Sequence, residues 1–139
     1  MGKIDRHFSR ELVSIDGSAP LRAAAGLLHE RRIGAIAVRD KGKVVGLLTE
    51  RDLVACVLDP SPQSNEPVLK WARKKLPTVG SSASESDCAN LMRDHNTRHL
   101  LVEDDGEIVG IISMRDVIRL MLDEKQFIIE QLQDYLYRS

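Results

Sequence analysis

The sequence contains two copies of one unit, set 64 residues apart. Residues 15–53 align with residues 79–117 without a gap, and eleven of the 39 aligned pairs are identical. A match of this length is hard to ascribe to composition, so each copy is expected to build the same small supersecondary unit. Any fold proposed for the chain has to contain that unit twice.

The apolar periodicity of the first copy predicts a β-α-β-β-α unit. A short strand at 12–15 is followed by a helix that starts near Ser18 to Pro20, because proline is tolerated at a first helical position. Two runs rich in Val, Ile and Leu, at 35–38 and 43–49, flank the turn signal Asp40-Lys41-Gly42 and are predicted to pair as neighbouring strands.

The second copy repeats this pattern and ends in a longer helix. Strands are predicted at 99–103 and 107–113, and helical spacing of apolar residues then continues to Leu136. The expected class is α/β (α+β). The expected boundaries are repeat 1 at 9–60, a linker at 61–75, repeat 2 at 76–123 and a C-terminal helical extension at 124–139.

The segment between the copies begins as a loop. Residues 59–67 are rich in Pro, Ser and Asn, and the cationic run at 70–75 contains Trp71. A cationic run with a tryptophan is one pattern of nucleic-acid binding. Here the run is short, the chain is nearly neutral, and no nucleic-acid-binding motif surrounds the run. We expect a solvated, partly helical connector with Trp71 packed on the fold, and we do not expect nucleic acid as a partner.

Composition narrows the class of protein. The chain of 139 residues is 42% hydrophobic and 29% charged with a formal net charge of -1, which is ordinary for a soluble globular domain. Cys56 and Cys88 lack metal-ligand spacing, so we expect reduced core thiols and no metal. Neither a leader-like apolar segment nor a membrane-length apolar run is present, and a cytoplasmic protein is expected.

The sharpest motif is a Gly-apolar-apolar-Thr/Ser-x-Arg-Asp element that occurs in both copies, at 46–52 and 110–116. One interpretation is purely structural: Thr49 and Ser113 are good helix N-caps, and an acid three residues later completes a near capping box. This interpretation explains the hydroxyl and the acid. It leaves unexplained the preceding glycine, the intervening arginine and the occurrence in both copies.

The other interpretation is a ligand site. A helix N-terminus binds phosphate, the hydroxyl of Thr49 or Ser113 adds a donor, and Arg51 or Arg115 can pair with phosphate. The carboxylate of Asp52 or Asp116 can accept hydrogen bonds from both hydroxyls of a ribose. Gly46 and Gly110 would allow close approach of the backbone to the ligand.

These residues, with the Ser18/Ser82 helix starts and the strand Arg98-His99-Leu100-Leu101-Val102, resemble a tandem pair of cystathionine-β-synthase (CBS) domains, also called a Bateman module. The resemblance covers about residues 9–123. It implies two pseudo-twofold-related repeats in one regulatory module, and ligand clefts between them. The ligands that it implies are AMP, ADP, ATP, NAD(H) or S-adenosylmethionine.

The resemblance also implies residue roles. Asp52 and Asp116 would hold ribose, with Thr49, Arg51, Ser113, Arg115 and Arg98 on the phosphate side. The base would lie against the end of the first strand and the start of the second in each repeat. These base-side positions are Ile15, Asp16, Ala35 and Ile36 in one site, and Val79, Gly80, His99 and Leu100 in the other.

The two expected sites differ in charge. The first repeat has Gly34-Ala35 where the second has Arg98-His99, so the second is expected to favour a charged phosphate tail. A hydrogen-bonded structural histidine remains an alternative for His99. The strands also carry Ala37 and Leu101 where the family commonly has proline, which could change the shape of the base pocket.

The sequence bears on two other function classes. An enzyme needs a nucleophile with its base, a metal set or paired acids, and neither Cys88 with His95 nor Asp52 with Asp116 supplies one, so we expect no enzyme and no catalytic cofactor. The alternative function is a ligand-free structural, protein-interaction or dimerisation module. We expect a regulatory module that binds an adenosyl ligand, forms a homodimer and acts on an effector protein in trans.

Overall fold

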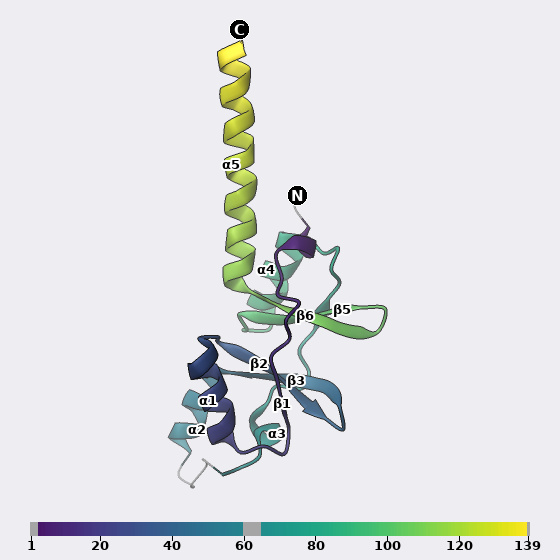
Figure 1. Cartoon of the computed structure of the whole chain (residues 1–139), viewed down its shortest axis with the longest axis vertical. Helices are drawn as coiled ribbons and strands as arrows, with labels where there is room; N and C mark the ends of the chain where they lie inside the picture. Colours follow the sequence, from purple (N-terminus) through teal and green to yellow (C-terminus); the bar gives the residue numbers. More distant parts are fainter. Residues whose placement is uncertain (1–2, 60–64, 139) are drawn as a thin grey trace. The chain divides into compact units, whose positions relative to one another are not determined.

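The computed structural model describes residues 3–59 and 65–138, which form two compact units (Figure 1). The first-repeat unit comprises residues 12–76. The second-repeat unit comprises residues 1–11 together with 77–139. Each unit is described by itself.

The first-repeat unit contains one three-stranded sheet in the order β1-β2-β3, in which β1 is parallel to β2 and β2 is antiparallel to β3. This confirms the predicted β-α-β-β-α order and both predicted central strands. Helix α1 begins one residue after Pro20, which is its N-cap. The elements are β1 (Ser14–Asp16), α1 (Leu21–Arg31), β2 (Ala35–Asp40), β3 (Lys43–Thr49), α2 (Glu50–Leu58) and α3 (Val68–Trp71).

The second-repeat unit has the same topology, with the sheet order β4-β5-β6. Its first helix starts later than predicted, because Ser84 rather than Ser82 is the N-cap and forms a capping box with Asp87. The elements are a 3-10 helix (Ile4–Arg6), β4 (Thr78–Val79), α4 (Glu85–Asp94), β5 (His99–Asp104), β6 (Glu107–Ser113) and α5 (Met114–Arg138).

The segment that precedes each repeat folds onto the sheet of the other repeat. The amide of Ile4 donates to the carbonyl of Ala83, and that of Val68 donates to Ala19, over 3.0 and 2.8 Å. All four residues obey the 64-residue offset, so the exchange is itself part of the duplication. Residues 66–73, expected as linker, are thus built into the first-repeat unit.

The same exchange continues along the outer strands. Ser9 exchanges backbone hydrogen bonds with Ile111 on β6, and Arg73 exchanges them with Leu47 on β3. In each three-stranded sheet, a short segment that is distant in sequence therefore pairs with the edge strand. Since backbone groups at a sheet edge need partners, these segments stabilise the edge strands β3 and β6.

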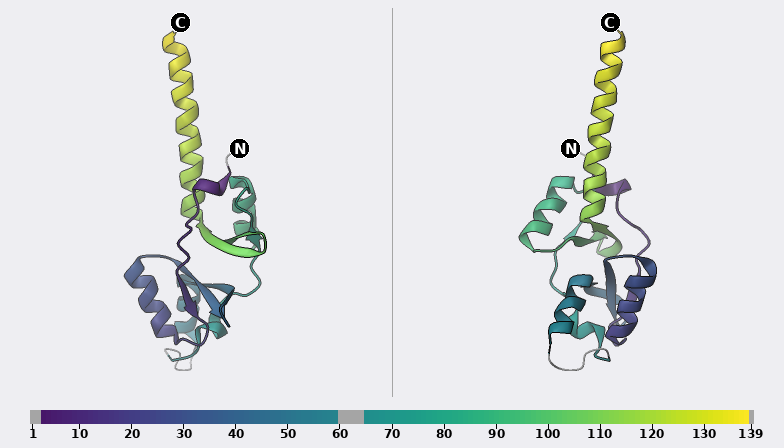
Figure 2. Two further views of the ribbon diagram at one scale, coloured as in Figure 1. Left: turned by 45° about the vertical axis from the view of Figure 1, so that its right-hand side comes forward. Right: turned by 90° about the vertical axis from the view of Figure 1, so that its left-hand side faces the viewer.

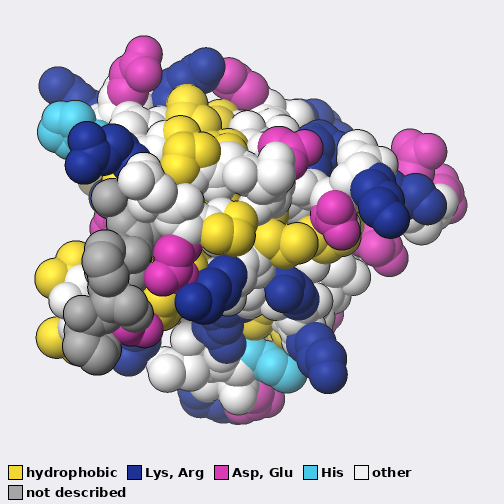
Figure 3. Space-filling view, turned by 90° about the horizontal axis from the view of Figure 1, so that it is seen from below, with side chains coloured by type: hydrophobic (Ala, Val, Ile, Leu, Met, Phe, Trp, Pro, Cys, Tyr) yellow, Lys and Arg dark blue, Asp and Glu magenta, His cyan; other side chains and the backbone are white. Residues whose placement is uncertain are grey.

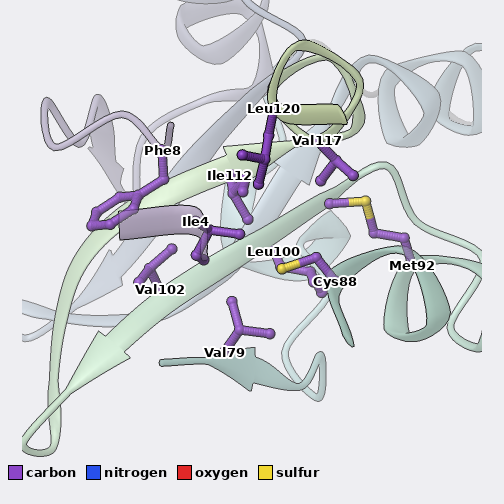
Figure 4. Close-up of a cluster of buried hydrophobic side chains, with 10 residues drawn as sticks. All are labelled: Ile4, Phe8, Val79, Cys88, Met92, Leu100, Val102, Ile112, Val117 and Leu120. Atoms are coloured by element: carbon purple, nitrogen blue, oxygen red, sulfur yellow. The ribbon is translucent and has the colours of Figure 1, made fainter. Parts of the chain in front are cut away.

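Each unit has its own hydrophobic core between its sheet and its helices. In the second-repeat unit, Ile4 and Phe8 from the N-terminal segment join side chains from the strands and from α4 and α5 (Figure 4). In the first-repeat unit the equivalent contact is Val68, which is fully buried. Both exchanged segments are therefore held by apolar burial as well as by hydrogen bonds.

Two features predicted for the connector are confirmed. Trp71 packs against the core of the first-repeat unit, and its indole N–H donates to Glu66 over 3.0 Å. The short helix α3 makes this segment partly helical, as expected. Most of the predicted loop at 59–67, namely residues 60–64, lies outside the described residues.

The C-terminal half of α5 projects beyond the rest of its unit (Figure 2). The prediction that the tail continues the helix is confirmed, whereas its apolar side chains, among them Ile128 and Leu132, are exposed rather than packed on their own domain. Among the described residues, no helix combines the length and apolar character that a membrane span requires. On the face drawn in Figure 3, acidic and basic side chains are interspersed.

Candidate functional site

The duplicated motif forms a strand-to-helix junction in each unit. At the start of α2, the Asp52 amide donates to Thr49 Oγ1 over 3.3 Å, while Asp52 Oδ2 accepts from the Thr49 amide over 2.8 Å and from its hydroxyl over 3.0 Å. The structural interpretation of the motif is therefore confirmed in the first repeat. A capping box satisfies backbone donors at a helix start and is worth about 1 kcal/mol.

The junction of the second repeat repeats these bonds. The Asp116 amide donates to Ser113 Oγ over 3.1 Å, and Asp116 Oδ2 accepts from the Ser113 amide and hydroxyl over 2.8 and 2.9 Å. Both carboxylates make their capping bonds through Oδ2. The capping role therefore occupies one carboxylate oxygen and leaves Oδ1 outside the box.

A second backbone bond ties the start of the central strand to each helix N-terminus. The Glu50 amide donates to the carbonyl of Gly34 over 3.0 Å, and the Met114 amide donates to that of Arg98 over 2.8 Å. The next ladder pair joins His99 to Ser113, as Ala35 pairs with Thr49 in the first unit. The structure thus brings the expected phosphate-side residues of each repeat to one helix end.

The side chains at the two helix ends differ. Arg98 is exposed and His99 is half-buried, whereas the equivalent Gly34 and Ala35 offer no polar side chain. Arg51 and Arg115 are exposed in the first turn of α2 and α5. Only the second-repeat junction therefore places a cation on the strand side as well as on the helix side.

The expected base-side residues are only partly brought together in the first unit. Ile15 and Asp16 pair with Val38 and Arg39, which lie three and four residues along β2 from Ala35. Asp16 instead accepts hydrogen bonds from the amide and hydroxyl of Ser18, over 2.9 and 2.6 Å, and Ile15 packs against the core.

Val13 and Ser14 lie within the predicted first strand, but the sequence did not indicate that they are its residues nearest to the start of β2. The Ala37 amide donates to the carbonyl of Val13 over 3.0 Å, and Ser14 pairs with Ala37. The alternation of apolar residues located the strand but could not give its parallel register. Val13 and Ser14 are therefore better placed than Asp16 to lie beside Ala35 and Ile36.

The base-side positions of the second unit show the same offset. Val79 pairs with Val102, whereas His99 and Leu100 begin β5. Val79 and Leu100 are buried in the core, as Ile36 is in the first unit, so these residues can offer a ligand little beyond backbone groups. Gly80 follows β4, and the next residue, Ser81, donates its amide to Asp104 over 2.9 Å.

Gly46 and Gly110 lie where the chain's own backbone comes too close to leave room for a side chain. A Cβ at Gly46 would lie 2.3 Å from the carbonyl oxygen of Arg73, and one at Gly110 would lie 2.3 Å from that of Ser9. The backbone that approaches these glycines is thus the chain's own exchanged segment. That they also make room for a ligand stays a prediction.

Local electrostatics stabilise charged carboxylates in the turns and neutral thiols in the cores. Hydrogen bonds from Ser18 lower the pKa of Asp16, and hydrogen bonds from Ser81 lower the pKa of Asp104. Burial raises the pKa of Cys88 to about 11, and burial likewise raises the pKa of Cys56. Within the described residues, no group of three or more His, Cys, Asp or Glu side chains is arranged to hold a metal ion.

With two such units and junctions in place, the chain belongs to the CBS-domain family. A family model described as the CBS domain matches residues 4–59 and 68–123, two stretches that are again offset by 64 residues. Hypoxic response protein 1 of Mycobacterium tuberculosis is 33% identical over 104 residues, which cover 71% of this chain and 71% of that protein.

Solved structures agree with this assignment. The CBS-domain-containing protein ATU1752 of Agrobacterium tumefaciens has a TM-score of 0.79 and 32% identity, over 85% of this chain and 89% of the other. The CBS domain protein PAE2072 of Pyrobaculum aerophilum, crystallised with AMP, has a TM-score of 0.75 and 28% identity, over 83% and 89% of the two chains.

Proposed function

We propose that this protein is a regulatory module that binds an adenosine-containing ligand, such as AMP, ADP, ATP, NAD(H) or S-adenosylmethionine. The observation that carries the proposal is the pair of strand-to-helix junctions, each with a hydroxyl and a carboxylate at a helix N-terminus. A structural relative, PAE2072, was crystallised with AMP, which supports this class of ligand.

The proposed contacts follow from the geometry of each junction. Oδ2 of Asp52 or Asp116 closes the capping box, so Oδ1 is the oxygen that would accept from ribose hydroxyls. The N-terminus of α2 or α5 favours negative charge, and the hydroxyl of Thr49 or Ser113 lies at that end. The same residues would thus serve the fold and the ligand through different atoms.

The second-repeat junction is the proposed phosphate-binding site. Arg98 and Arg115 are exposed, and Arg98 is joined to the helix start through its carbonyl. An arginine can form charge-assisted, bidentate hydrogen bonds to phosphate, which Gly34 in the first repeat cannot do. We propose that a ligand with a phosphate tail prefers the second repeat.

The proposed mechanism is a population shift rather than catalysis. A ligand that binds one arrangement of the repeats better than another raises the population of that arrangement, and an effector protein recognises it. The module would act in trans as a cytoplasmic homodimer.

The test is a thermal melt of the protein with each nucleotide. A ligand that binds only the folded state, at 100 times its dissociation constant, adds about 2.7 kcal/mol and raises the melting temperature by several degrees. We expect at least one of AMP, ADP, ATP, NADH and S-adenosylmethionine to do so. We expect Asp116→Ala to remove most of that shift.

Asp116→Ala also breaks a capping box, so the control is Asp87→Ala. Asp87 forms the same kind of box with Ser84 at the start of α4, away from the proposed site. Both variants should melt earlier without ligand, but only Asp87→Ala should keep the ligand-induced shift. A folded protein that shows no shift with any ligand would instead support a ligand-free interaction module.

A further inference from the structure

An apolar stripe runs along the exposed side of α5. It contains three columns with seven-residue spacing, 118/125/132, 121/128/135 and 122/129/136, in which Lys125 is the single charged residue. The apolar members are 44% to 76% exposed. The members of this α5 stripe are Ile118, Met121, Leu122, Ile128, Ile129, Leu132, Tyr135 and Leu136.

The second-repeat unit does not cover this stripe. Leu120 is the last buried residue among the described side chains of the helix, and every side chain from Lys125 to Tyr137 is exposed. The part of α5 that carries them projects from its unit (Figures 1 and 2). An isolated helix of about 12–15 residues is marginal in water, and Ile, Phe and Tyr are poor helix formers. The projecting half of α5 therefore needs a packing partner to remain helical.

We propose that this partner is α5 of a second copy of the chain, packed antiparallel to the first. A sustained seven-residue apolar repeat is the pattern of helices that pair as a coiled coil. A second copy supplies a stripe of the same length and period, and a twofold axis makes one surface complementary to itself.

Lys125 determines the direction of the pair. In a parallel, in-register pair each stripe residue faces its own copy, so Lys125 would face the partner's Lys125 inside an apolar seam. An antiparallel pair centred near Glu130 places Lys125 opposite the partner's Tyr135, whose ring can pack on its aliphatic stem and attract its ammonium group. The same alignment places Ile128 opposite the partner's Leu132, and Leu122 beside the partner's Leu136.

This pairing rests on the homodimer of the proposed function and gives it an interface, and it needs no nucleotide. It is tested first by the mass of the protein in sedimentation, measured without ligand. The variant Ile128→Asp with Leu132→Asp places two charges in the seam, and we expect it to halve the mass of the wild-type assembly. The control, Gln126→Asp with Gln133→Asp, adds the same charges outside the stripe and should keep the wild-type mass.

Circular dichroism melts would show that both variants retain their folded units. A monomeric wild-type protein, or a stripe variant that keeps the full mass, would overturn the proposal. Neither result bears on nucleotide binding, which the melts with ligand test separately.

The direction is tested by spin labels on single cysteines placed outside the stripe. Cys56 and Cys88 are buried, so labels will react mainly at the exposed positions introduced by Glu130→Cys or Asp123→Cys. In the antiparallel pair the two labels at 130 share one level along the axis, while those at 123 are about 21 Å apart along it. A shorter distance at 130 supports the proposal, and equal distances at both positions would overturn it.

Discussion

The first repeat has Gly34 and Ala35 where the second has Arg98 and His99, although both pairs lie at the start of a strand and make the same backbone hydrogen bonds. In both units the carbonyl of residue 34 or 98 accepts from the first amide of the following helix, and the next residue pairs with the capping hydroxyl residue. The backbone bonds are thus common to both copies, while the side chains that would meet a ligand have diverged.

The side chains that stabilise the turns after β1 and β4 have diverged as well. In the first repeat, Asp16 accepts hydrogen bonds from Ser18 within its own turn. The second repeat has Gly80 at the position of Asp16, and Asp104 from the end of β5 accepts from Ser81 instead. A turn can therefore be stabilised by different carboxylates, so a duplicated fold does not require duplicated side chains.

The largest expected effect on the free energy of unfolding comes from substitutions in the exchanged segments. Ile4→Ala removes a fully buried side chain from the core of the second-repeat unit, and we expect a loss of about 2–5 kcal/mol in the free energy of unfolding by urea. Val68→Ala should cost less, because fewer buried atoms are removed. The control is Val54→Ala at a position that is 62% exposed, where a change within about 0.5 kcal/mol is expected. An Ile4→Ala variant as stable as this control would contradict the exchange.

The two motif glycines provide the next comparison. Gly46→Ala and Gly110→Ala each force a Cβ against backbone, with an expected cost of about 1–3 kcal/mol. The cost should be greater at Gly110, where the new Cβ also meets the ring of Phe8 at 2.6 Å. Gly26→Ala in α1 meets no atom within 4 Å and should stabilise the protein by about 0.5–1 kcal/mol. Equal urea midpoints for all three variants would show that the segments do not approach these glycines.

The smallest effect concerns pH. The pKa of Asp104 is lowered in the folded protein by its bonds to Ser81, so its contribution to stability is present above the ordinary pKa of about 3.9 and is lost as pH falls through the folded value. Asp104→Asn should therefore weaken the loss of stability between neutral and acidic pH, measured by urea titrations. Asp40→Asn, at the equivalent position of the first repeat, is the control, since Asp16 serves that turn. An identical pH dependence for Asp104→Asn and the wild type would contradict this role.

The sequence predicted the two sheets and their helices because the matched residues carry both periodicity and turn signals. It did not predict the exchange of leading segments, since those segments share little identity. Their clearest shared signal is the apolar pair Ile4 and Val68 at the 64-residue offset. This apolar pair does not indicate which sheet each segment joins, which only the hydrogen bonds in the structure show.

The candidate site was predicted best where its chemistry is local. The hydroxyl and carboxylate of each junction are three residues apart, so helix geometry alone brings them together. The base-side residues depend on the register between strands β1 and β2, which alternation of side chains does not give. The glycines were assigned to a ligand because nothing in the sequence indicates that a distant backbone approaches them.

The most direct test of the account is calorimetric titration of Arg98→Ala with AMP and with adenosine. Because Arg98 is the strand-side cation that only the second repeat carries, its removal should weaken AMP binding by about threefold to tenfold and leave adenosine binding unchanged. Arg93→Ala, which removes an exposed arginine that pairs with Asp94 in the last turn of α4, should leave both affinities unchanged. Unchanged AMP affinity in Arg98→Ala, or an equal loss for both ligands, would contradict a phosphate-binding site at the second repeat.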